Sequence, residues 1–93
     1  MYRTSFNCLR AEQPLEKAIC TTGALASLDR ELSQRYSTLR GTLSQELRQR
    51  LRIEQRQWLR KRNQKCGDAS DMGGCLDTVY RQRINELVEW KSK

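Results

Sequence analysis

The chain of 93 residues has the length of one domain, and its 18 basic against 11 acidic residues give a net charge of +7. Leu, Ile, Val and Phe make up about 19% of it, close to the share of ~20% below which disorder is expected, so a stable fold needs help from cross-links. No apolar run is long enough to span a membrane, and no histidine is present to serve as a general base or zinc ligand.

The first half of the chain predicts two helices. Pro14 suits a first helical turn and predicts a short helix over residues 14–20, which residues 21–23 end. A second helix follows, because apolar side chains recur every three or four residues along one face. The members of this stripe are Leu25, Leu28, Leu32, Tyr36 and Leu39. Gly41 suits a helix end and Ser44 an N-cap, so we expect a break between them; one continuous helix is the alternative, at a cost of ~1 kcal/mol for Gly41.

The second half predicts a third helix, a loop and a last helix. The third helix covers about residues 45–65, and residues 67–74 form a loop by their Gly, Asp and Ser content. The last helix begins near Cys75, and we expect residues 91–93 to fray. The stripe of the third helix is Leu47, Leu51 and Trp58, and that of the last is Leu76, Val79, Tyr80, Leu87 and Trp90. Without any strand-like alternation, the chain is expected to be all-α, a bundle of three to four helices in one domain over residues 1–93.

The four cysteines favour two disulfides. The pairing Cys8–Cys20 with Cys66–Cys75 closes two short loops and is the one we expect, although four cysteines allow three pairings. A metal site is disfavoured, because zinc sites use cysteines two to four residues apart, and we expect no cofactor. Disulfides persist in oxidising compartments, so we expect a periplasmic or secreted protein. The first residues have no apolar signal core, which suggests a mature form whose export signal has been removed.

The positive charge is concentrated in the third predicted helix. Residues 31–65 carry a net charge of +7, whereas residues 66–93 carry −1. Four arginines lie mostly opposite the apolar stripe and should face solvent: Arg48, Arg52, Arg56 and Arg60. Such a row can hold phosphates or carboxylates by paired hydrogen bonds, so an anionic envelope polymer or nucleic acid is a candidate partner. An ordinary solvated face is the simpler interpretation, and without interleaved aromatics or a known motif, specific nucleic-acid recognition is not expected.

Two charges fall on apolar stripes. Glu54 lies between Leu47 and Trp58 on the third helix, and Arg83 lies among the apolar residues of the last helix. A charge on a packing face needs a partner, because desolvating it alone costs several kcal/mol. We therefore expect a structural ion pair between Glu54 and Arg83 that fixes the register of these helices.

No arrangement of residues predicts catalysis. Nucleophilic catalysis needs a base beside serine or cysteine, and the chain has no imidazole. Asp68 and Asp71 are the only close acids in a flexible region, and Gly73 with Gly74 is too little for a phosphate-binding loop. We expect a binding protein without catalytic residues.

Several strings resemble the LprI-like lysozyme-inhibitor domain family. The opening of the chain carries residues 5–8, 14–20 and 28–32, with Tyr36. The most specific string is residues 54–63, Glu-Gln-Arg-Gln-Trp-Leu-Arg-Lys-Arg-Asn, shortly before the third cysteine. The closing helix matches at Cys75, Leu76, Tyr80, Arg83, Ile84 and Leu87. The resemblance covers about residues 5–89; the chain departs from it at Asn7, where Asp is usual, and in its glycine-rich linker between the last two cysteines.

The resemblance implies a small exported helical domain of bacteria with two local disulfides, and a role in binding and inhibiting lysozyme. Animal lysozymes are strongly basic, so a chain of charge +7 is repelled at long range. We therefore expect contact through a local acidic patch formed by Asp68, Asp71 and Asp77. Binding of a polyanion to the arginine row is the alternative, and an envelope protein with no soluble ligand is a third.

Overall fold

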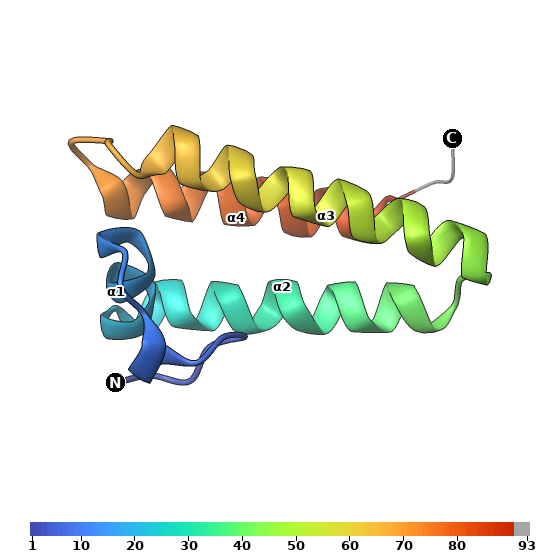
Figure 1. Ribbon diagram of the computed structural model, residues 1–93, viewed down its shortest axis with the longest axis horizontal. Coiled ribbons are helices and arrows are strands. Elements are labelled where there is room, and N and C mark those ends of the chain that lie inside the picture. The colour runs from blue at the N-terminus through green and yellow to red at the C-terminus, as the bar shows by residue number, and fades with distance from the viewer. Residues whose placement is uncertain (91–93) are drawn as a thin grey trace.

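The computed structural model describes residues 1–90, which are mostly helical and contain no strand (Figure 1). The elements in chain order are a short 3-10 helix η1 (Cys8–Arg10) and the helices α1 (Pro14–Thr21), α2 (Gly23–Gly41), α3 (Gln45–Cys66) and α4 (Met72–Val88). The three long helices run in alternating directions, and α1 with the N-terminal segment covers one end of α2 (Figure 1). The predicted all-α bundle is confirmed. None of the helices in the described range is both long and apolar enough to cross a membrane.

The core lies where α4 packs against α2, with α1 closing one end and α3 the remaining side. The stripes predicted for α2 and α4 supply most of it, because leucines spaced three or four residues apart share one face. The buried members are Leu15, Ile19, Leu25, Leu28, Leu32, Leu51, Cys66, Leu76, Val79, Tyr80, Ile84 and Leu87. For its length the α3 helix contributes least, since only Leu51, Arg62 and Cys66 of its 22 residues are buried.

Both expected disulfides are present. Cys8 pairs with Cys20 across a Cα separation of 5.9 Å, and Cys66 pairs with Cys75 across 5.5 Å. The first ties the N-terminal segment to α1, and the second ties the end of α3 to the beginning of α4. Each cross-link of this kind stabilises by ~2–4 kcal/mol, chiefly by restricting the unfolded chain.

The predicted break after Gly41 is confirmed. The Thr42 hydroxyl donates a hydrogen bond to the Leu39 carbonyl at 2.8 Å, which satisfies a carbonyl at the end of α2. Ser44 then accepts a hydrogen bond from the Leu47 amide at 3.4 Å, as an N-cap of α3. The chain thus turns back on itself within three residues, and α3 lies antiparallel to α2.

The last helix begins at Met72, three residues before the start predicted near Cys75. The reason is Asp71, whose carboxylate accepts a hydrogen bond from the Gly74 amide at 3.0 Å and caps the helix. Two of the three glycines of the predicted loop, Gly73 and Gly74, therefore belong to the first turn of α4. The fraying expected of residues 91–93 lies outside the described residues.

The N-terminal segment is packed against the bundle, which the sequence did not predict. The Tyr2 amide donates to the Cys20 carbonyl at 2.9 Å, and the ring of Phe6 packs against the core. The Arg30 guanidinium donates to the Arg3 carbonyl at 2.7 Å. The segment therefore closes the face of α1 and α2 that would otherwise expose core side chains.

Candidate binding surfaces

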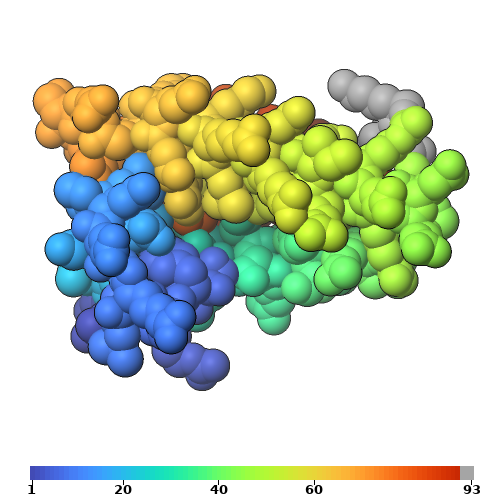
Figure 2. All heavy atoms as spheres, in the orientation of Figure 1, coloured from blue at the N-terminus to red at the C-terminus, as the bar shows by residue number. Residues whose placement is uncertain are grey.

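The short connection between α3 and α4, residues 67–71, forms one tip of the molecule, where orange atoms protrude in Figure 2. We call it the end loop. The Cys66–Cys75 disulfide holds its two ends together. A turn in which the Ala69 amide donates to the Cys66 carbonyl at 3.2 Å adds to this restraint. The end loop is therefore protruding and restrained at once.

The three acidic residues expected to form one patch have different roles in the structure. Asp71 caps α4, and Asp77 forms an ion pair with Arg81 at 3.0 Å one turn along the same helix. Asp68 is exposed on the end loop and has no side-chain partner within residues 1–90. Of the three, Asp68 is thus the carboxylate most available to a partner.

The predicted arginine row faces solvent. All four of its members, Arg48, Arg52, Arg56 and Arg60, are exposed along α3. Figure 2 shows α3 crossing one face of the molecule without being covered by another element. Arg48 also donates to the Arg40 carbonyl at 3.0 Å, which attaches the start of the row to the end of α2.

The ion pair predicted between Glu54 and Arg83 is not formed. Arg83 is buried, as expected, but its Nε donates to Gln55 Oε1 at 3.0 Å and its Nη1 to Glu86 Oε1 at 3.1 Å. Glu54 is exposed and accepts a hydrogen bond from the Trp90 indole at 3.2 Å. The prediction was wrong because Gln55, the neighbour of Glu54 in α3, comes within reach of Arg83.

A buried polar network that the sequence analysis missed joins the three long helices. Tyr80 of α4 donates its hydroxyl hydrogen to Asp29 Oδ1 of α2 at 2.8 Å. The Tyr80 hydroxyl oxygen in turn accepts a hydrogen bond from Arg62 Nη1 of α3 at 2.9 Å. The other carboxylate oxygen of Asp29 accepts from the Ser5 amide, so the N-terminal segment joins the network. Burial is compensated because each polar group finds a partner.

The aromatic surroundings of this network explain its effect on Tyr80. Trp58 packs edge-on against the Tyr80 ring with centroids 5.3 Å apart, and the Arg62 guanidinium lies 5.9 Å from the Trp58 ring centre. Burial raises the pKa of the Tyr80 hydroxyl well above its ordinary value; the charge of Arg62 opposes the rise, and Asp29 adds to it. Tyr80 is therefore a neutral hydrogen-bonding group throughout the physiological range.

A signal for this network was present in the sequence. Arg62 stands four residues after Trp58 and four before Cys66, so it continues the α3 stripe. Asp29 stands four residues after Leu25 and three before Leu32, at the edge of the α2 stripe. A search for charges at stripe spacing would have found both residues, although not their shared partner.

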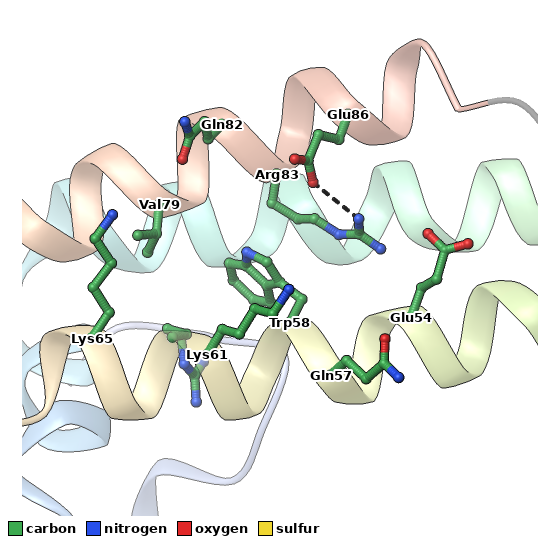
Figure 3. Close-up of a pocket in the computed structure, with 10 residues that line it drawn as sticks. Glu54, Gln57, Trp58, Lys61, Lys65, Val79, Gln82, Arg83 and Glu86 are labelled. Atoms are coloured by element: carbon green, nitrogen blue, oxygen red, sulfur yellow. Dashed lines mark hydrogen bonds and ion pairs between the residues drawn. The ribbon is translucent and has the colours of Figure 1, made fainter.

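A groove of about 280 Å³ lies between α3 and α4. Trp58, Val79 and Arg83 line it, and Lys61, Lys65 and other polar side chains surround them (Figure 3). Residues 1–90 contain no group of three or more Cys, His, Asp or Glu side chains placed to hold a metal ion.

One known protein family matches this chain. The model of one family, the lysozyme inhibitor LprI, matches residues 8–87, which is most of the chain. No curated protein and no solved structure gives a significant match. The match includes all four cysteines and runs from the start of η1 to Leu87 in the last turn of α4. The chain therefore belongs to the lysozyme inhibitor LprI family.

Proposed function

We propose that this protein is an exported, non-enzymatic binding protein that inhibits lysozyme. The match to the lysozyme inhibitor LprI family over residues 8–87 is the observation that carries the proposal. The two disulfides support export, because such bonds persist in the periplasm or outside the cell. A small cross-linked bundle is also suited to recognition, since a rigid surface loses little conformational freedom on binding.

The end loop is the part of the molecule that we propose to contact lysozyme. It protrudes at one tip, and the Cys66–Cys75 disulfide restrains it before binding. A protruding, restrained loop can enter a concave active-site cleft at low entropic cost. Asp68 is exposed there, where it can meet a basic rim, whereas the overall charge of +7 opposes the approach of a basic enzyme. Local complementarity thus has to overcome long-range repulsion.

Titration of a c-type lysozyme with the purified, oxidised protein tests this function. Clearing of a peptidoglycan suspension should slow in proportion to the amount of protein added, and Asp68→Lys should weaken the inhibition about tenfold or more, as for loss of a close charge contact. Glu31→Lys is the matched control, because it makes the same charge change at an exposed site on α2. Full lytic activity at large molar excess of the protein would contradict the proposal. Equal effects of the two variants would contradict only the role of the end loop.

A second candidate function is binding of an anionic envelope polymer through the arginine row. The observation that favours it is that all four members of the row, Arg48, Arg52, Arg56 and Arg60, are exposed on one uncovered helix. Four guanidinium groups about one turn apart can follow a chain of phosphates or carboxylates. This surface lies along the side of the bundle, whereas the end loop lies at its tip, so the two functions are separable.

Binding to heparin, a model polyanion, at increasing salt concentrations tests the second function. The affinity should fall steeply with salt, and the double variant Arg52→Glu with Arg56→Glu should bind weakly and with a shallower salt dependence. The matched control is Lys17→Glu with Arg35→Glu, which makes the same charge change on α1 and α2. If both double variants lose affinity equally, net charge rather than the row is responsible. The Arg52 and Arg56 variant should also associate faster with basic lysozyme, because repulsion is reduced.

A further inference from the structure

The groove between α3 and α4 contains a buried cation with unused hydrogen-bonding capacity. Arg83 is 5% exposed, and its Nε and Nη1 donate to Gln55 and Glu86. Its Nη2 is buried and has no hydrogen-bond partner within residues 1–90. Buried donors in folded proteins are almost always paired, by protein groups, water or a ligand. An acceptor entering the groove from outside would complete the hydrogen bonding of this guanidinium.

The charges around the groove favour an anion as that acceptor. Figure 3 shows Lys61 and Lys65 extending from α3 toward α4, while Arg83 extends from α4 toward α3. The two acidic residues of the rim are already engaged, since Glu86 accepts from Arg83 and Glu54 accepts from the Trp90 indole. Arg62 lines the groove as well, so the lining contains four cations and two carboxylates, and both carboxylates already accept hydrogen bonds from the protein.

The size and lining of the groove restrict the ligand further. A volume of about 280 Å³ is at the lower end of small-molecule sites and cannot enclose a polymer. Trp58 and Val79 provide an apolar wall between the cationic side chains. Gln57 and Gln82 add neutral polar groups at the rim. A ligand that fits has a charged group and a compact apolar or planar body.

We propose that this groove binds a small organic carboxylate, with its carboxylate on Arg83 and Lys61 and its body against Trp58. An organic carboxylate is favoured over inorganic phosphate, because phosphate has no apolar body to cover Trp58 and Val79. Gln55 and Glu86 leave Nη2 as the unused donor of this guanidinium, and a ligand reaches it once the side chains that cover it shift. This site is separate from both the end loop and the arginine row, and it does not depend on lysozyme inhibition.

Titration of the isolated protein with indole-3-acetate, followed by two-dimensional ¹H–¹⁵N NMR, tests the proposal. The Trp58 indole and Arg83 Nε–H signals should shift saturably, with a Kd on the order of 1 mM for so small a ligand. Indole-3-acetamide has the same body without the charge and should cause no saturable shift. Inorganic phosphate should bind more weakly than the carboxylate. Equal binding of phosphate would overturn the proposed ligand class, and no saturable shift with indole-3-acetate would overturn the site.

Substitutions locate the binding on the protein. Lys61→Gln should weaken indole-3-acetate binding several-fold, whereas Arg60→Gln, which removes a charge from the adjacent exposed position outside the groove, should leave it unchanged. Arg83→Lys keeps the charge but removes the planar fork, and should weaken binding further. If Arg83→Lys does not fold, the comparison of Lys61→Gln with Arg60→Gln decides whether indole-3-acetate binds in the groove. Equal affinities of those two variants would overturn the proposal, and lysozyme inhibition is scored separately by lysis.

Discussion

The hydroxyl of Tyr80 donates to Asp29 Oδ1 at 2.8 Å, although 51 residues separate them in the chain. Arg62 donates to the same hydroxyl oxygen at 2.9 Å. One oxygen atom thus connects α2, α3 and α4 inside a mostly apolar core. Because a buried polar group is costly when it loses its partner, this arrangement favours one relative position of the three helices over others.

Replacing Tyr80 by phenylalanine should destabilise the fold by ~1–3 kcal/mol, because Asp29 and Arg62 each lose a buried partner. Urea unfolding monitored by circular dichroism measures the change. Tyr36→Phe is the control, since Tyr36 is only half-buried and its hydroxyl makes no hydrogen bond within the described residues. Equal stability of the Tyr80→Phe variant and the unaltered protein would show that the network does not contribute.

Tyr80 should also make the stability fall at alkaline pH. Burial raises its pKa in the folded state above the ordinary value of about 10. As the pH rises above the ordinary pKa of about 10, the unfolded chain loses the phenolic proton while the folded protein keeps it. The free energy of unfolding therefore decreases. Below about pH 9 this group causes no pH dependence.

Urea unfolding at several pH values between about 8 and 11 checks this expectation. The difference in free energy of unfolding between the unaltered protein and Tyr80→Phe should be constant at the lower pH values and shrink at the higher pH values. A difference that stays constant across the range would contradict a raised pKa for Tyr80.

Leu51 should be the most sensitive apolar position of α3. It is fully buried, whereas Ile53, two residues away, is 56% exposed. Leu51→Ala should cost ~2–5 kcal/mol through lost burial and the cavity left behind. Ile53→Ala should change the free energy of unfolding by less than about 0.5 kcal/mol. Similar losses at both positions would contradict the packing of α3 described above.

The two disulfides should stabilise the bundle independently. Replacing Cys66 and Cys75 by alanine should lower the free energy of unfolding by ~2–4 kcal/mol, and so should replacing Cys8 and Cys20. Since the pairs lie in different connections, the losses should add in the quadruple variant. Thermal unfolding with and without a reducing agent provides an independent measurement. An unaltered melting temperature after full reduction would show that cross-links are not needed.

Local features were largely predictable. The break after Gly41, the Ser44 cap and the solvent-facing arginine row were all expected from residue types and their spacing. The early start of α4 was missed because Asp71 was assigned to a loop, although an aspartate before two glycines can also cap a helix. Such errors remain local and move a boundary by a few residues.

Contacts between helices were harder to predict. Periodicity gives the direction in which a side chain points from its own helix axis. It does not give the position of that side chain along the axis relative to a neighbouring helix. This is why Arg83 was correctly expected to be buried, and wrongly paired with Glu54 instead of Gln55 and Glu86. The packed N-terminal segment escaped prediction because hydrogen bonds to Asp29 and Cys20 depend on the assembled bundle.

The sequence by itself determined an all-α domain with two short-range disulfides, a charged outer face on α3 and apolar stripes on the helices, because each depends on residues near one another in the chain. The tertiary structure alone decided that Asp29, Arg62 and Tyr80 meet and that Arg83 lines a groove, as well as which acidic residue remains available on the end loop. These features depend on the axial offset between helices, which is set by how all the side chains pack together.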